Sequence, residues 1–191
     1  KALLVVAVLV HLSLLLSWQF GFWNRFTFDS TTTHGRRGWD FYALYQAGHN
    51  VLTGISAYES DNDKIAVVVP WYTPFRYLPI SAYTLGVGLN LLSPSVALYV
   101  WAITVEIVLL LCCRRSWRLA REPNEAATLA SMWLLYTPFY LELYLGQFTL
   151  VQAALVFWLL LAADGTAADG TVDRRSLGPA WVLSLLWKQN T

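Results

Sequence analysis

Residues 2–20 read ALLVVAVLVHLSLLLSWQF, an apolar run with His11 near its middle. At 1.5 Å of rise per residue, a helix of this length covers roughly 28 Å, which is enough to cross the hydrocarbon core of a bilayer. Further apolar runs follow at 95–113, 126–145, 148–163 and 177–191, and the last of these begins near the end of the chain. We therefore predict an all-α polytopic membrane protein.

Composition supports the same class. Of the 191 residues, 57% are hydrophobic and only 13% are charged, whereas ordinary soluble domains carry about 25% charged residues. The net charge of +1 favours no nucleic-acid partner. Cys112 and Cys113 are adjacent, and we interpret them as small apolar side chains and not as a disulfide or metal framework.

Residues 21–79 are predicted to form a long loop outside the bilayer. An aromatic cluster opens it, as is typical of the membrane–water boundary. Within the loop, 41–52 have apolar residues at helical spacing, and Gly54 follows the run. This predicted amphipathic helix is too short and too polar to cross a membrane, so we expect it to lie on the membrane surface. The aromatic cluster consists of Trp18, Phe20, Phe22, Trp23 and Phe26.

The stretch Gly38-Trp39-Asp40-Phe41-Tyr42 places one acid, between aromatic residues, at the head of this helix. Two interpretations are open. An Asp immediately before a helix is typical of an N-cap. An acid held at the membrane surface also suits proton transfer to or from a bound substrate.

The segment 80–92 decides the topology. It has the length of re-entrant or interfacial pieces, and Gly86, Gly88 and Asn90 interrupt it. If it does not cross, the long loop lies outside the cell, and the arginine-rich loops after 113 and around Arg174 lie inside, as the positive-inside rule prefers. This choice places Asp40, Gln147 and Lys188 together on the extracytoplasmic face.

Four short motifs follow one another along the chain: Asp40-Phe41-Tyr42 with Gly54 and Tyr58, Trp71-Tyr72-Thr73-Pro74 with Leu78-Pro79, Leu145-Gly146-Gln147-Phe148, and Trp187-Lys188-Gln189-Asn190. Their order resembles that in a GT-C superfamily glycosyltransferase. Within that superfamily the chain is most similar to the family 87 polyprenol-phosphate-mannose-dependent mannosyltransferases, with a weaker likeness to dolichyl-phosphate-glucose glucosyltransferases. Thr73 and Thr149 depart from the family pattern, which often has proline and asparagine there.

The resemblance implies a GT-C-like helical bundle and an inverting sugar transfer. A sugar, mannose by analogy, would pass from a polyprenyl-phosphate donor to a hydroxyl of a lipid-linked or glycan acceptor at the outer face of the cell membrane. Asp40 would be the general base. The likeness covers the amino-terminal part of such enzymes, so we expect the chain, which starts at Lys1 without methionine, to be a fragment.

The same resemblance suggests further substrate-binding residues. Lys188 and Arg76 are candidates to contact the phosphate or the acceptor, although a lysine at a span end also snorkels and a juxtamembrane arginine also anchors headgroups. Gln147 is a candidate to bind a sugar hydroxyl, or else to serve the turn it occupies. Tyr72 is a candidate to stack on a sugar, or else an interfacial anchor. Glu142 faces either the outer pocket or a helix partner.

No cofactor is predicted. The chain lacks a convincing metal-ligand spacing, although Asp61 and Asp63 could weakly bind a divalent ion. Two other functions stay open. The acids inside spans, Glu106 and Glu142, together with His11, would suit a transporter or flippase, and a non-catalytic subunit of glycan assembly is the third possibility.

Overall fold

The computed structural model describes residues 1–27, 36–136 and 138–163. These residues form helices and connecting segments and contain no strand, which confirms the predicted all-α class for this part of the chain. In chain order the helices are α1 (Ala2–Phe20), α2 (Asn24–Thr27), α3 (Trp39–Leu52), α4 (Pro79–Ser81), the π-helical turn η1 (Ala82–Gly86), α5 (Val87–Leu89), α6 (Pro94–Leu119), α7 (Pro123–Leu134), α8 (Pro138–Leu145) and α9 (Thr149–Ala163).

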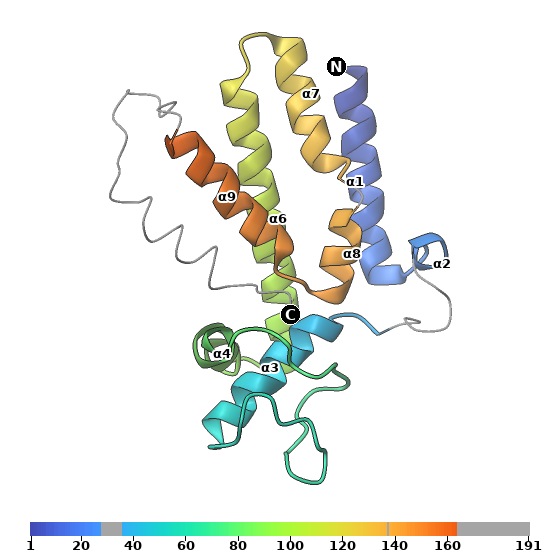
Figure 1. Ribbon diagram of the computed structural model, residues 1–191. Coiled ribbons are helices and arrows are strands. Elements are labelled where there is room, and N and C mark those ends of the chain that lie inside the picture. Colours follow the sequence, from blue (N-terminus) through green and yellow to red (C-terminus); the bar gives the residue numbers. More distant parts are fainter. Residues whose placement is uncertain (28–35, 137, 164–191) are drawn as a thin grey trace.

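The helices form two parts (Figure 1). In one part, α1, α6 and α7 run along a similar direction and α9 crosses α6 obliquely. Helix α6 packs against α7 and α9, and α1 packs against α7 and α8. In the other part, α3, α4, η1 and α5 gather at one end of this bundle. The start of α1 and the α6–α7 turn lie at the opposite end. The Asp40-bearing stretch and the arginine-rich turn are therefore at opposite ends of the bundle.

Two helices, α1 and α6, are long and apolar enough to cross a membrane. Helix α6 starts one residue before the predicted run 95–113 and continues six residues beyond it, through Arg114, Arg115 and Arg118. Arginine is a good helix former, so a basic sequence extends a helix past the apolar core without ending it. The helix α9 is apolar but shorter.

The prediction of one continuous helix over 126–145 is wrong. Helix α7 ends at Leu134, and α8 begins at Pro138. Proline has no N–H to donate and disfavours the helical conformation in the residue before it, so Pro138 separates two helices. The break lets α8 pack against both α1 and α3.

The predicted surface-lying amphipathic helix is also corrected. Helix α3 covers the expected residues, but it is buried on every side from Phe41 to Gly48. Its polar side chains bond to the segment that follows: Gln46 Nε2 donates to the Ala66 carbonyl (2.9 Å), and Asn50 Nδ2 donates to the Glu59 carbonyl (3.0 Å). These bonds remove the cost of burying amides, so the polar face of α3 is a second packing face.

The segment η1–α5 lies across α3 and does not run alongside α1 and α6 (Figure 1). The segment η1–α5 crosses α3 with backbone packed against backbone, at Gly86 and Gly48 respectively. A Cβ atom at Gly48 would lie 2.2 Å from the Gly86 carbonyl carbon. Asn90 Nδ2 closes the crossing by donating to the Tyr45 carbonyl (2.9 Å). Gly86, which interrupts the apolar run 80–92, is thus a contact point between two helical segments.

Inside the bundle, His11 of α1 bonds to Glu106 of α6. The Nε2–Oε1 distance is 2.9 Å, and His11 is 4% exposed. Pairing lowers the cost of placing an acid among apolar helices. His11 and Glu106 are therefore partners of each other and link α1 to α6 inside the bundle.

Candidate functional site

The site begins where the chain enters α3. Gly38 is the N-cap and has a left-handed backbone conformation (φ 77°), and its N–H donates to the Tyr144 carbonyl of α8 (2.7 Å). Asp40 lies in the first turn of α3, so the interpretation of Asp40 as the N-cap is wrong. An acid in a first turn is stabilised by the positive end of the helix dipole. Its carboxylate is half-buried.

The α8–α9 turn docks directly on this helix start. Gly146 has φ 70°, and a Cβ atom there would lie 2.5 Å from the Cβ of Phe41. The turn places Gln147 so that its Nε2 donates to Asp40 Oδ2 at 2.7 Å. Two residues that are 107 positions apart, and that were predicted to lie on the same face, are therefore in contact.

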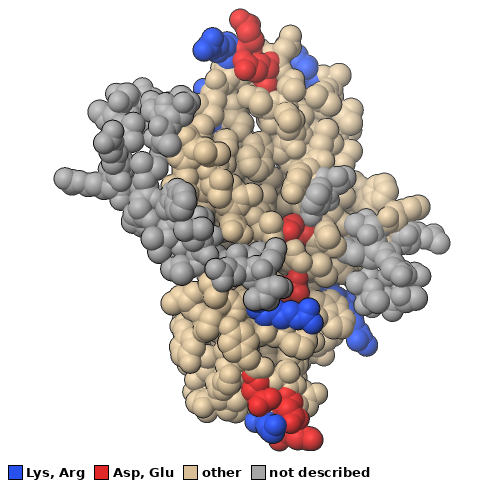
Figure 2. All heavy atoms as spheres, viewed as in Figure 1, with Lys and Arg blue, Asp and Glu red and all other residues tan. Residues whose placement is uncertain are grey.

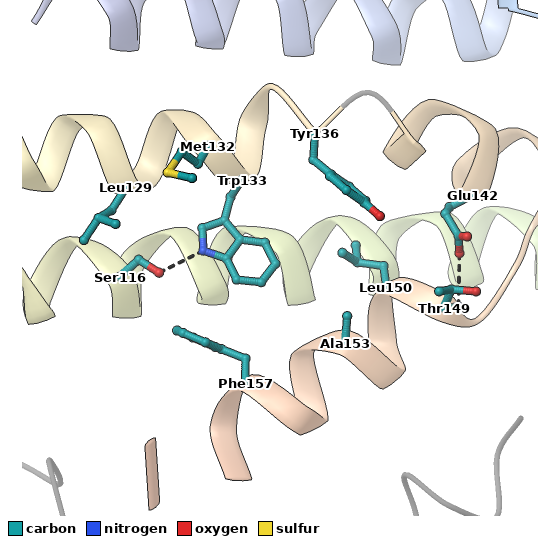
Figure 3. Close-up of a pocket in the computed structure, with 10 residues that line it drawn as sticks. All are labelled: Ser116, Leu129, Met132, Trp133, Tyr136, Glu142, Thr149, Leu150, Ala153 and Phe157. Atoms are coloured by element: carbon teal, nitrogen blue, oxygen red, sulfur yellow. Dashed lines mark hydrogen bonds between the residues drawn. The ribbon is translucent and has the colours of Figure 1, made fainter. Parts of the chain in front are cut away.

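Glu142 joins the same turn. Its side chain is buried, its carbonyl accepts the Gln147 N–H (2.9 Å), and its carboxylate Oε2 accepts the N–H of Thr149 (3.0 Å), at the start of α9 (Figure 3). A carboxylate at this position satisfies a backbone donor that the helix itself leaves unpaired. Glu142 and Asp40 are thus both tied to residues 147–149.

A cavity of about 450 Å³ lies between α6, α7, α8 and α9. Most of its lining is apolar, with Glu142 and Thr149 at one end and the Trp133–Ser116 hydrogen bond (2.8 Å) toward the other (Figure 3). An elongated apolar space that ends at an acid suits an amphiphilic molecule. It is lined by Ser116, Leu129, Met132, Trp133, Tyr136, Glu142, Thr149, Leu150, Ala153 and Phe157.

Tyr77 is a site residue that the sequence analysis missed. Burial raises the pKa of its phenol, and the negative charges of Asp40 and then Glu142 raise that pKa further. The phenol therefore stays protonated, and its hydroxyl makes no hydrogen bond with a residue that the structure describes. The one available signal was its place between Arg76 and Leu78-Pro79, within a quoted motif.

The other predicted site residues are placed less centrally. Tyr72 donates to Asn62 Oδ1 (3.1 Å), which ties it to the loop and not to the α8–α9 turn. Arg76 is exposed. Lys188 lies outside the described residues. The site that the structure assembles therefore consists of Asp40, Gln147, Glu142 and Tyr77.

Charged side chains gather at the two ends of the molecule and at the level where α3 meets the bundle (Figure 2). In the described ranges, no group of three or more His, Cys, Asp or Glu side chains could hold a metal ion. Asp61, considered for a weak divalent site, instead pairs with Lys64 at 3.1 Å and accepts the N–H of Asp63.

Comparisons with protein-family models, with curated proteins and with solved structures find no match to this chain.

Substituting Gly146 by alanine is expected to disrupt the Asp40–Gln147 contact. The new Cβ atom would collide with Phe41 and push the α8–α9 turn away from α3. We expect loss of most of the sugar-transfer activity proposed for this site, and a lower melting temperature. Gly54→Ala is the matched control, because Gly54 has the same kind of backbone (φ 76°) with nothing within 4 Å. Equal effects of the two substitutions would show that backbone strain matters and the contact does not.

Proposed function

We propose that the protein is a membrane glycosyltransferase that moves a sugar, mannose by analogy, from a polyprenyl-phosphate donor to an acceptor hydroxyl, with inversion. The observation that carries the proposal is the Asp40 carboxylate, held by Gln147 at one end of a bundle that contains two helices of membrane-spanning length. The family 87 resemblance of the same residues supports it.

In the proposed reaction, the acceptor oxygen attacks the anomeric carbon as the bond from that carbon to the phosphate oxygen breaks. Asp40 takes the hydroxyl proton, and the polyprenyl phosphate leaves with the bonding electron pair. The bond from Gln147 fixes the orientation of the carboxylate, which is a requirement for efficient proton transfer. The protonated phenol of Tyr77 is a nearby donor for a sugar or phosphate oxygen.

We propose that this site faces the extracytoplasmic leaflet. The turn between α6 and α7 follows Arg114, Arg115 and Arg118 and contains Arg121, at the end of the bundle opposite α3. Because basic residues near spans favour the cytoplasmic side, Asp40 would lie outside. The apolar cavity that ends at Glu142 is suited to the first isoprene units of the donor.

A transporter is the second candidate, because acids lie within the apolar helices. Two contacts make it the weaker one. Glu106 has a structural partner in His11, and Glu142 bonds to the backbone at the start of α9. Transporters place substrate and ion sites at broken helices near the midplane, whereas the site of Asp40 and Gln147 lies at one end of the bundle.

The two functions are separated by one experiment with the purified protein in vesicles that contain labelled polyprenyl-phosphate-mannose and a lipid extract as acceptor. A transferase moves the label into a new glycolipid and releases polyprenyl phosphate in equal amount. A flippase leaves the label on the donor and changes only its leaflet. If neither outcome is observed in the presence of the full acceptor extract, the remaining interpretation is a non-catalytic subunit of glycan assembly.

A further inference from the structure

A second polar pocket lies at the end of α1, separate from the Asp40–Gln147 contact. It has a volume of about 290 Å³. Arg37 reaches it from the segment before α3, and the remaining lining comes from the end of α1, from α2 and from α8. The lining residues are Trp18, Gln19, Phe20, Gly21, Asn24, Arg37 and Tyr144.

Arg37 supplies the positive charge of this pocket. Its guanidinium donates to Gln19 Oε1 (2.8 Å) and to the Trp18 carbonyl (3.2 Å), and it stacks on the Trp18 ring at 4.6 Å. These partners are neutral, and in the part of the chain that the structure describes no carboxylate pairs with Arg37. A half-buried guanidinium held in a fixed orientation by neutral described partners is suited to bind an anion, and its planar fork matches phosphate.

Asn24 adds a second donor. The residue is 8% exposed, and its Oδ1 accepts a hydrogen bond from the Tyr140 hydroxyl (2.6 Å). That bond fixes the amide so that Nδ2 lies on the side of Gly21, 3.1 Å from where a Cβ atom would be, and Nδ2 has no acceptor among the described residues. An amide donor with no acceptor among the described residues, beside a guanidinium whose described partners are all neutral, suits a ligand with several acceptor oxygens.

The surroundings identify the source of that anion. Along α1, Leu9, Leu12 and Leu16 are 50% to 61% exposed and lie at helical spacing, and they lead to Phe20, which is 74% exposed and lines the pocket. Beyond the pocket, Phe22, Trp23 and Phe26 are also exposed. An apolar ridge on a membrane-length helix would contact the acyl chains of a lipid. The polar pocket among aromatic residues at the end of this ridge would contact its headgroup.

We propose that the Arg37 pocket binds the phosphate of an anionic glycerophospholipid whose acyl chains lie along the exposed face of α1. The lipid joins α1, α2 and the segment before α3, so it stabilises the connection on which the position of α3 depends. This site is independent of the sugar-transfer reaction.

The test measures binding of short-chain phosphatidylglycerol to the purified protein by native mass spectrometry. Phosphatidylcholine and inorganic phosphate are the comparison ligands. Arg37→Gln is expected to weaken phosphatidylglycerol binding at least about tenfold, which is the scale of a lost charge-assisted hydrogen bond. Arg36→Gln is the matched control, since it removes the same charge one residue earlier from an exposed side chain that stacks on Trp39, and it should bind as the wild type does.

Equal binding by Arg37→Gln and Arg36→Gln would overturn the proposal, and so would equal occupancy by phosphatidylcholine or full competition by inorganic phosphate. If Arg37→Gln does not fold, the unaltered protein is labelled with a phosphatidylglycerol that carries a photoreactive headgroup. Crosslinks on residues 18–24 or on Arg37 support the site, and crosslinks confined to other segments contradict it.

Discussion

Asp40→Asn is expected to lower the rate of sugar transfer by about 10²- to 10⁴-fold, which is the usual contribution of a positioned general base. The fold should survive, because an asparagine Oδ1 can still accept the hydrogen bond that Gln147 donates at 2.7 Å. Loss of the favourable charge in the first turn of α3 costs only about 0.3–1 kcal/mol. The measurement is initial rate against enzyme concentration, with melting temperature recorded on the same samples.

The matched control for that substitution is Asp61→Asn. Asp61 is a loop acid whose partner is the exposed Lys64, and an exposed ion pair contributes little to stability. It should leave both transfer and melting temperature unchanged. An Asp40→Asn protein that transfers sugar within a few fold of the wild type would remove Asp40 from the mechanism. A large fall in both variants would indicate a general charge effect.

Gly48→Ala is expected to produce the largest loss of stability. The added methyl group would lie 2.2 Å from the Gly86 carbonyl carbon and 2.3 Å from its oxygen, and backbone atoms cannot move aside as a flexible side chain can. Separating α3 from η1–α5 should cost roughly 3 kcal/mol, which lowers the melting temperature by roughly 6–12 °C in a chain of this size. Thermal unfolding of the purified protein measures it.

Gly88→Ala provides the control within the same helical segment. No atom lies within 4 Å of a Cβ placed there, so alanine should be neutral or stabilise by up to about 1 kcal/mol through its higher helix propensity. If both substitutions destabilise the protein equally, the crossing at Gly48 and Gly86 is not the contact that holds α3.

The elements that could be predicted are those with local signals. The apolar runs predicted α1 and the apolar part of α6, and the helical spacing from Phe41 onward predicted α3 to within two residues. The break before α8 had a local signal too, because Pro138 stands inside the apolar run 126–145.

The burial of α3 and the composition of the site could not be predicted in the same way. Gln46 and Asn50 look exposed by hydropathy, and only the fold brings the carbonyls of Ala66 and Glu59 to them. The Asp40–Gln147 bond, between residues 107 positions apart, depends on two left-handed glycines, Gly38 and Gly146, that meet where α8 packs on α3. The choice of topology predicted that Asp40 and Gln147 lie on the same face of the membrane. Their contact could not be predicted, because it requires the packing of α8 on α3.

The proposed mechanism is tested most directly by the anomeric configuration of the sugar that the wild-type protein transfers from polyprenyl-phosphate-mannose. One displacement assisted by one carboxylate inverts the anomeric carbon, so the product linkage should have the opposite configuration from the donor. A product that retains the donor configuration, or intact donor after incubation with a full acceptor extract, would contradict it.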